Sequence, residues 1–131
     1  MLQKKILVLT IISLALLSAC AQIGTEKEIV KIIGTRAGDL TLKYENGQAT
    51  LSGTLQRSTP CVNWSVETVT TKDLPISNVN IQVYNKNKDA ICIQVLGEPQ
   101  EIKEAIAQVS ENTEYTVKFE ETTIFSGKLE Q

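Results

Sequence analysis

Apolar side chains recur at every second position along much of this sequence, and a period of two is the pattern of a half-buried β-strand. The alternation is clear in Leu40, Leu42 and Tyr44, is interrupted by Asn46-Gly47, and resumes over 49–55. Asn-Gly supplies the positive φ angles of a two-residue type I′ turn. The two alternating segments are therefore predicted to form a β-hairpin.

Further segments with the same period follow, and clusters of turn-forming residues separate them. Short alternating strands between such turns predict a mostly β chain that folds as an antiparallel sandwich. The predicted strands contain Val62-Trp64-Val66, Val79-Ile81-Val83, Ile91-Ile93-Val95, Tyr115-Val117-Phe119 and the segment from Thr122 to Leu129.

One segment shows a different spacing. Ile102, Ala105, Ile106 and Val109 recur at helical intervals, and acidic residues near Pro99 favour a helix N-terminus. The pattern predicts one short helix near 99–109 that crosses between two strands. A strand over 101–109 is the alternative, because tertiary context often overrides a short pattern.

The N-terminus resembles a bacterial-type lipoprotein signal. Lys4 and Lys5 precede the apolar run Ile6 to Leu17, and Leu17-Ser18-Ala19-Cys20 has the form of a lipobox. The run is shorter than the ~20 apolar residues that span a bilayer. The resemblance implies that Cys20 receives a diacylglycerol on its sulfur and that the chain is cleaved before it. A plain secretory signal with a cysteine near the cut by chance is the alternative.

This resemblance sets the expected organisation and location of the protein. We expect a lipoprotein signal peptide over 1–19, the lipidated cysteine and a tether over 20–28, and the β-sandwich domain over 29–131. The acyl chains on Cys20 would hold the protein in a lipid bilayer. The expected location is the cell membrane or the outer membrane, with the domain facing the periplasm or the exterior.

Two cysteines remain once Cys20 carries lipid. An even remainder predicts one disulfide, Cys61–Cys92, formed outside the cytoplasm. In its predicted strand each cysteine has the opposite parity to the apolar residues. Both sulfurs are therefore expected on the outer or less apolar face of one sheet, where the bridge would join neighbouring strands. A redox or metal role is the alternative, but there is no Cys-x-x-Cys spacing.

Three short motifs resemble a pattern of small exported immunoglobulin-like domains in prokaryotic lipoproteins. They are Thr59-Pro60-Cys61, Cys92-Ile93-Gln94-Val95 and Tyr115-Thr116-Val117, and the resemblance covers roughly 59–119. It implies a disulfide-bonded immunoglobulin-like β-sandwich. In most such domains no activity is established, so no catalytic residue is carried over.

The composition argues against most enzyme classes. The chain has no histidine, which excludes His-based acid–base catalysis, Ser/His/Asp or Cys/His arrangements and histidine metal sites. Its seven glycines are scattered, so no phosphate-binding loop is predicted. We therefore predict no catalytic residue, no metal site and no cofactor. Without the two leader lysines the formal charge is −4, from 11 basic and 15 acidic residues, so nucleic acid is not an expected partner.

Two functions remain. The first is a membrane-anchored binding or structural module at the cell envelope, with an envelope or extracellular protein as its partner. The second is a small inhibitor of secreted proteases. The segment from Lys72 to Asn78 is a candidate recognition loop, and Trp64 is expected in the core because it shares the parity of Val62 and Val66.

Overall fold

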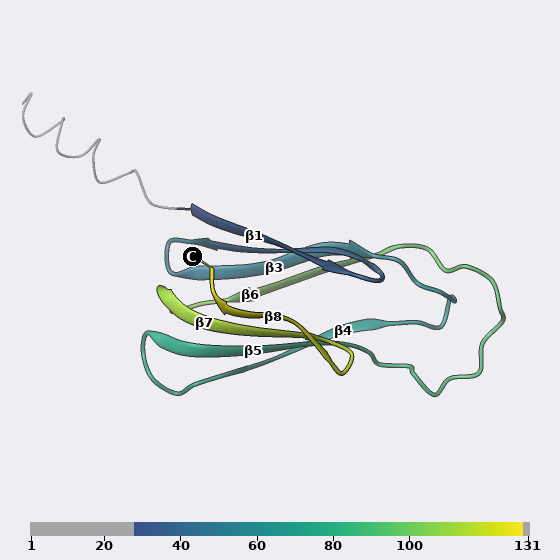
Figure 1. The fold of residues 1–131 in the computed structure, drawn as a ribbon. Coiled ribbons are helices and arrows are strands. Elements are labelled where there is room, and N and C mark those ends of the chain that lie inside the picture. Colours follow the sequence, from purple (N-terminus) through teal and green to yellow (C-terminus); the bar gives the residue numbers. More distant parts are fainter. Residues whose placement is uncertain (1–27, 130–131) are drawn as a thin grey trace, which may run out of the picture.

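The computed structural model describes residues 28–129, and every regular element in this range is a β-strand. Eight strands form two four-stranded sheets that pack face to face around one core (Figure 1). The first sheet has the order β1-β2-β3-β6 and the second has the order β4-β5-β7-β8. The strands are β1 (Glu28–Thr35), β2 (Gly38–Glu45), β3 (Gln48–Leu55), β4 (Trp64–Thr70), β5 (Ile76–Asn85), β6 (Gln100–Ile106), β7 (Val109–Phe119) and β8 (Thr122–Lys128).

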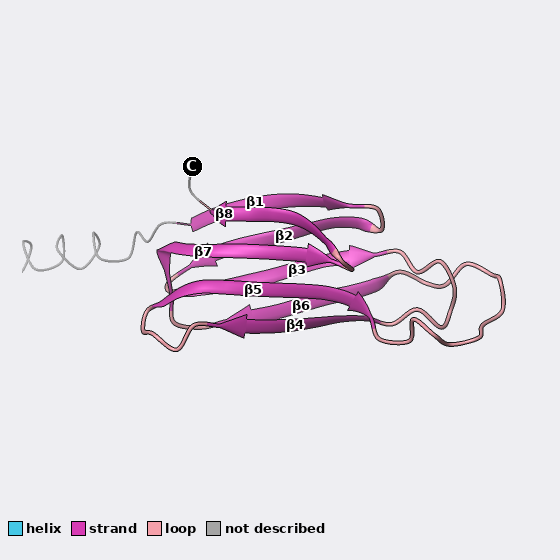
Figure 2. Ribbon diagram, turned by 60° about the horizontal axis from the view of Figure 1, so that its bottom comes forward, coloured by secondary structure: helices cyan, strands magenta, loops and turns pink. Residues whose placement is uncertain are grey.

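The edge strands of the two sheets lie above one another. Figure 2 shows β1 and β8 along one side of the sandwich and β4 and β6 along the other. The predicted mostly β sandwich is confirmed. Because the two sheets close over each other, the inward residues of all eight strands share one apolar interior.

The predicted hairpin is confirmed as β2 and β3. Asn46 and Gly47 have φ angles of 54° and 75°, as a type I′ turn requires. The strands pair from Glu45↔Gln48 outward, which points Leu42 and its partner Leu51 into the core, both with no exposed surface. Local sequence therefore determines both the turn and the register here.

The second sheet is mixed, so the prediction of a purely antiparallel sandwich is wrong for one pair of strands. β5 and β7 run parallel, with partners from Ile76↔Val109 to Val83↔Phe119. Between them the chain crosses to the first sheet, forms β6 and returns. The chain reverses its direction once before β6 and once after it. β7 therefore runs in the same direction as β5 and pairs with it in the second sheet.

The predicted helix near 99–109 is wrong. Residues 100–106 form β6, which pairs with β3, and Val109 begins β7 after a turn in which Gln108 has a φ of 62°. Ile102 and Ile106 are both buried. A spacing of four residues places side chains on one face of a helix and also on one face of a strand, so their periodicity does not distinguish the two. The alternative of a strand in this region is the correct one.

β1 was not among the strands predicted from the alternation. It pairs with β2 without interruption from Glu28↔Glu45 to Thr35↔Gly38. Ile33 is buried and Ile29 packs partly against the core, whereas Val30 and Ile32 are exposed on the opposite face. Apolar residues on both faces hide the period of two, which explains why the pattern did not reveal this strand.

The predicted leader lies outside the described residues. This applies to the signal peptide, to the lipobox cysteine Cys20 and to the tether up to residue 27. Within residues 28–129, no element is a helix with the length and apolar character needed to cross a membrane.

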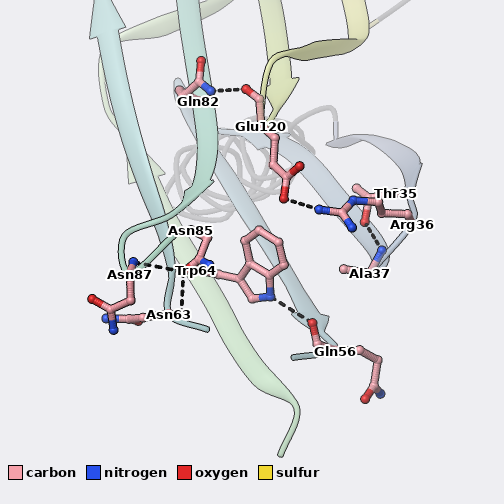
Figure 3. Close-up of polar contacts among 10 residues, drawn as sticks. All are labelled: Thr35, Arg36, Ala37, Gln56, Asn63, Trp64, Gln82, Asn85, Asn87 and Glu120. Carbon is pink, nitrogen blue, oxygen red and sulfur yellow. Dashed lines mark hydrogen bonds and ion pairs between the residues drawn. The ribbon is translucent and has the colours of Figure 1, made fainter. Parts of the chain in front are cut away.

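Trp64 begins β4 and belongs to the core, as its parity predicted. Its side chain is 6% exposed, and its ring centroid lies 4.9 Å from that of Phe119. The indole Nε1 donates a hydrogen bond to the carbonyl oxygen of Gln56 at 2.9 Å (Figure 3). The buried polar atom is thereby satisfied, so Trp64 contributes packing and is not available to a ligand.

Tyr115 is the one large buried side chain whose polar atom has no such partner in the described range. It lies on β7 with 1% of its surface exposed, and its hydroxyl makes no hydrogen bond there. Burial raises the pKa of Tyr115 to about 12, and the nearby Tyr44 acts in the same direction. The fold therefore holds this hydroxyl in its neutral form at an energetic cost.

Tyr115→Phe is expected to raise the free energy of unfolding by about 1 kcal/mol at pH 7, because it removes a buried hydroxyl without a partner. The difference in the free energy of unfolding between the variant and the wild type should increase at alkaline pH. An unfolded tyrosine loses its proton near pH 10, whereas Tyr115 in the fold keeps its proton until about pH 12, so wild-type stability falls in this window.

Urea denaturation of both proteins at pH 7 and pH 11 measures the effect. Tyr84→Phe, at a half-buried tyrosine of β5, serves as the matched control. A Tyr115→Phe protein less stable than wild type at pH 7 would contradict the prediction, because it would show that the hydroxyl makes a stabilising contact.

Candidate binding loop

The longest connection in the described part of the chain is the segment 86–99, which joins β5 to β6. It leaves the second sheet and returns into the first. Figures 1 and 2 show it at the end of the sandwich opposite to the start of β1. We call this segment the apolar loop. The predicted strand through Ile91, Ile93 and Val95 is therefore wrong, because β5 ends at Asn85 and 91–95 lies outside both sheets.

The predicted disulfide Cys61–Cys92 is confirmed, with the two Cα atoms 5.9 Å apart and the residues 31 positions apart in sequence. Its expected location is wrong. Cys61 lies in the turn before β4, and Cys92 lies in the apolar loop, so the bridge joins two loops. The parity argument failed because it assumed paired strands at both positions.

Hydrogen bonds fix the start of the apolar loop to the neighbouring loop 56–63. The Lys86 backbone N–H donates to the carbonyl oxygen of Asn63 at 2.8 Å, and Asn87 Nδ2 donates to the carbonyl oxygen of Cys61 at 3.1 Å. Asn85 Oδ1 accepts from the backbone N–H groups of Asn63 and Asn87, both at 3.0 Å (Figure 3). Three asparagines therefore determine the direction in which the loop leaves β5.

A second set of contacts fixes the end of the apolar loop. The Gly97 backbone N–H donates to the carbonyl oxygen of Arg57 at 3.0 Å, and Arg57 Nε donates to the carbonyl oxygen of Glu98 at 2.5 Å. A Cβ atom on Gly97 would lie 2.6 Å from the carbonyl oxygen of Thr59. Only glycine allows the two loops to approach this closely, so these contacts fix the position where the loop returns to the first sheet.

The same end of the sandwich is braced between the sheets. The Arg36 guanidinium, from the turn between β1 and β2, pairs with the Glu120 carboxylate, from the turn between β7 and β8 (Figure 3). It also lies 5.7 Å from the ring centroid of Phe119. An exposed ion pair contributes at most about 1 kcal/mol, but it helps to hold the two sheets beneath the loops.

The segment between these contacts exposes aliphatic side chains. Ile91 is fully exposed, and Ile93, Val95 and Leu96 are each more than half exposed. The alternation in the sequence predicted that Ile91, Ile93 and Val95 face the core. Because single exposed apolar residues are common but contiguous groups are not, the group of four on this loop is the candidate contact surface of the domain.

No known protein family, curated protein or solved structure matches this chain. The assignment of function therefore depends on the geometry of the apolar loop and on the sequence.

This surface is apolar, and the charges of its loop balance. The apolar loop has no net charge, because its two basic residues are balanced by two acidic ones: Lys86, Lys88, Asp89 and Glu98. In residues 28–129 no three His, Cys, Asp or Glu side chains gather into a potential metal site. An open hollow of about 750 Å³ lies beside the loop and includes Lys88 and Glu120 in its wall. Its wall consists of residues with polar side chains and is open to solvent, so the exposed aliphatic side chains remain the most distinctive feature.

The recognition loop predicted from sequence lies elsewhere. Residues 71–75 connect β4 to β5, and the last three residues of the predicted loop already belong to β5, which begins at Ile76. Figure 1 shows this connection at the end where β1 starts, away from the apolar loop. The sequence did contain a signal for the apolar loop, because Asn85–Asp89 and Gly97-Glu98-Pro99 are turn-forming clusters on both sides of the apolar residues.

Proposed function

We propose that this protein is a lipoprotein anchored through acylated Cys20, and that its sandwich is a binding module at the cell envelope. The apolar loop is its contact surface for an envelope or extracellular protein. The observation that carries the proposal is a group of four exposed aliphatic side chains on a loop held by a disulfide. The lipobox supports the anchor, and the packed sheets and the disulfide support kinship with immunoglobulin-like domains, although this bridge joins loops.

The fixed shape of the loop favours binding. A flexible loop loses conformational entropy when a partner orders it, whereas a preorganised loop has lost that entropy on folding. The disulfide and the contacts of Lys86 and Gly97 hold this loop before any partner arrives. Ile91 and Ile93 can then enter an apolar pocket on the partner with little further ordering.

A photoreactive amino acid in intact cells tests the contact. Incorporated at Ile93, it is expected to form an adduct with one protein, and Ile91→Ser in the same chain should lower the yield roughly 10-fold, because burying an isoleucine is worth about 1.5–3 kcal/mol. The matched control is the photoreactive group at Val69, an exposed valine on β4. Equal adducts at both positions, or a yield unaffected by Ile91→Ser, would contradict the proposal.

Inhibition of a secreted protease is the second candidate function, and the full exposure of Ile91 on a braced loop favours it. Such a loop can present one side chain to a specificity pocket without being distorted. The same experiment separates the two functions. An adduct inside the substrate cleft of an exported protease supports the inhibitor, and an adduct with any other envelope protein supports the module.

A further inference from the structure

β1 carries a second exposed apolar surface. Val30 is 50% exposed and Ile32 is 67% exposed, and both project from the outer face of the first sheet. β1 is an edge strand, and its other face already contributes Ile33 to the core. We call the surface formed by Val30 and Ile32 the β1 patch. Folding of the domain does not account for it, because the described residues bury neither side chain.

The surroundings of the β1 patch are close to neutral. Ile32 pairs with Thr41, and Val30 pairs with Lys43 on β2. The Lys43 ammonium lies 3.4 Å from Glu28 and 3.2 Å from Glu45, and these carboxylates raise its pKa, Glu45 most strongly. The cation next to the patch on this face is therefore already paired, whereas Lys31, between Val30 and Ile32, points to the other face, with its ammonium 5.6 Å from the ring centroid of Phe125. An anionic partner surface would therefore gain little electrostatic attraction here, and the patch favours contact with an apolar, uncharged surface.

The length of chain before β1 indicates what covers the patch. Cys20 precedes Glu28 by eight residues, which span at most about 28 Å when fully extended. β1 is thus the element held nearest to an acyl chain on Cys20. Once the acyl chain is inserted in the bilayer, the β1 patch meets the bilayer surface at a high effective concentration. Two partly exposed aliphatic side chains are then enough to favour this second contact.

We propose that the β1 patch rests on the bilayer that holds acylated Cys20 and thereby orients the domain. This inference rests on the lipid anchor of the proposed function. The apolar loop begins beyond the end of β5, whose ten residues span about 30 Å from the end of the sandwich where β1 starts. The loop also follows the side formed by β4 and β6, away from β1 (Figure 2). The membrane contact therefore leaves the apolar loop free for a protein partner.

Tryptophan scanning in vesicles tests the orientation. The full-length lipidated chain is reconstituted into phosphatidylcholine vesicles with brominated acyl chains, which quench nearby indoles. Ile32→Trp is expected to lose roughly half of its added emission, because a side chain at the headgroup–acyl boundary lies about 5–10 Å deep. Val69→Trp and Ile93→Trp are the matched controls, since both positions are exposed and far from β1. The native Trp64 is buried and supplies the background.

The outcomes separate the anchor from the orientation. A chain that does not float with the vesicles has no acyl anchor, which overturns both proposals. A chain that floats, but in which Ile32→Trp is quenched no more than Val69→Trp, overturns only the orientation. An indole at position 32 that acrylamide cannot reach and brominated lipid does not quench is covered by protein, such as a second copy, and this also overturns the orientation.

A second reporter guards against a local effect of the indole at position 32. Thr41→Trp lies on the same face of the first sheet, opposite Ile32. Its quenching by brominated lipid should fall to the Val69→Trp level when Val30→Ser and Ile32→Ser are added, without a change in flotation. Quenching that persists in the combined variant would show that the patch does not hold this face to the bilayer. Replacing the neutral lipid in part by anionic lipid should leave the quenching unchanged.

Discussion

Replacing Cys61 and Cys92 together by alanine is expected to lower the free energy of unfolding by about 3–4 kcal/mol. The bridge closes a loop of 31 residues, and in the chain-entropy model its removal restores that much conformational freedom to the unfolded state. For a domain of this size the loss is a large share of the total stability. Both sheets should keep their strands, because neither cysteine lies in one.

The double variant should also release the apolar loop. Amide hydrogen exchange in 88–96 is expected to accelerate, since the disulfide is the main restraint between the contacts at Lys86 and Gly97. Urea denaturation followed by Trp64 fluorescence gives the stability. Ile93→Ala, which keeps the bridge and alters an exposed side chain, should change stability by less than about 0.5 kcal/mol. A double variant within 1 kcal/mol of wild type, or with unchanged exchange in the loop, would contradict this role of the disulfide.

Cys20→Ser is expected to abolish lipid attachment entirely. Only the Cys20 sulfur would accept the diacylglycerol, and a serine hydroxyl does not replace it. Growth with labelled fatty acid should label the wild-type chain and leave the Cys20→Ser chain unlabelled and unprocessed. The wild type should be found with the membranes, because two or three acyl chains give durable binding at about 0.8 kcal/mol per buried methylene.

The other cysteines provide the control for lipid attachment. Cys61→Ser removes a sulfur outside the lipobox and should leave the labelling unchanged. Labelling that persists in Cys20→Ser would show that lipid is attached elsewhere. An unlabelled wild-type chain that is recovered in the soluble fraction would show that the leader is an ordinary secretory signal, which is the alternative considered from sequence.

Strands with an uninterrupted period of two were predicted correctly. β2 and β3 around Asn46-Gly47, the centre of β5 and the end of β7 each bury one face against the same core. In such segments the local pattern and the tertiary environment agree, so the sequence is sufficient. Trp64 follows the same rule, because its parity in β4 alone determines that it faces inward.

Two segments were predicted incorrectly, because their local pattern did not match the tertiary environment. Ile102 and Ile106 fit one face of a helix as well as one face of a strand, and the free edge of β3 selected the strand by offering hydrogen bonds to β6. The alternation in 91–95 resembles a strand, but no strand edge pairs with it in the described sandwich. The candidate site was missed for this reason, since the sequence showed apolar residues where the structure exposes them.

The sequence by itself determined the β character of the chain, the central hairpin, the inward residues of the regular strands and the pairing of Cys61 with Cys92. These follow from side-chain periodicity, turn chemistry and cysteine count, which need no knowledge of distant neighbours. Only the tertiary structure decided the parallel contact of β5 with β7, the strand β6 and the exposure of the apolar loop. Each of these depends on which strand edges remain free once the first hairpins have formed, and hydrogen bonding between edges is a non-local property that no short window of sequence contains.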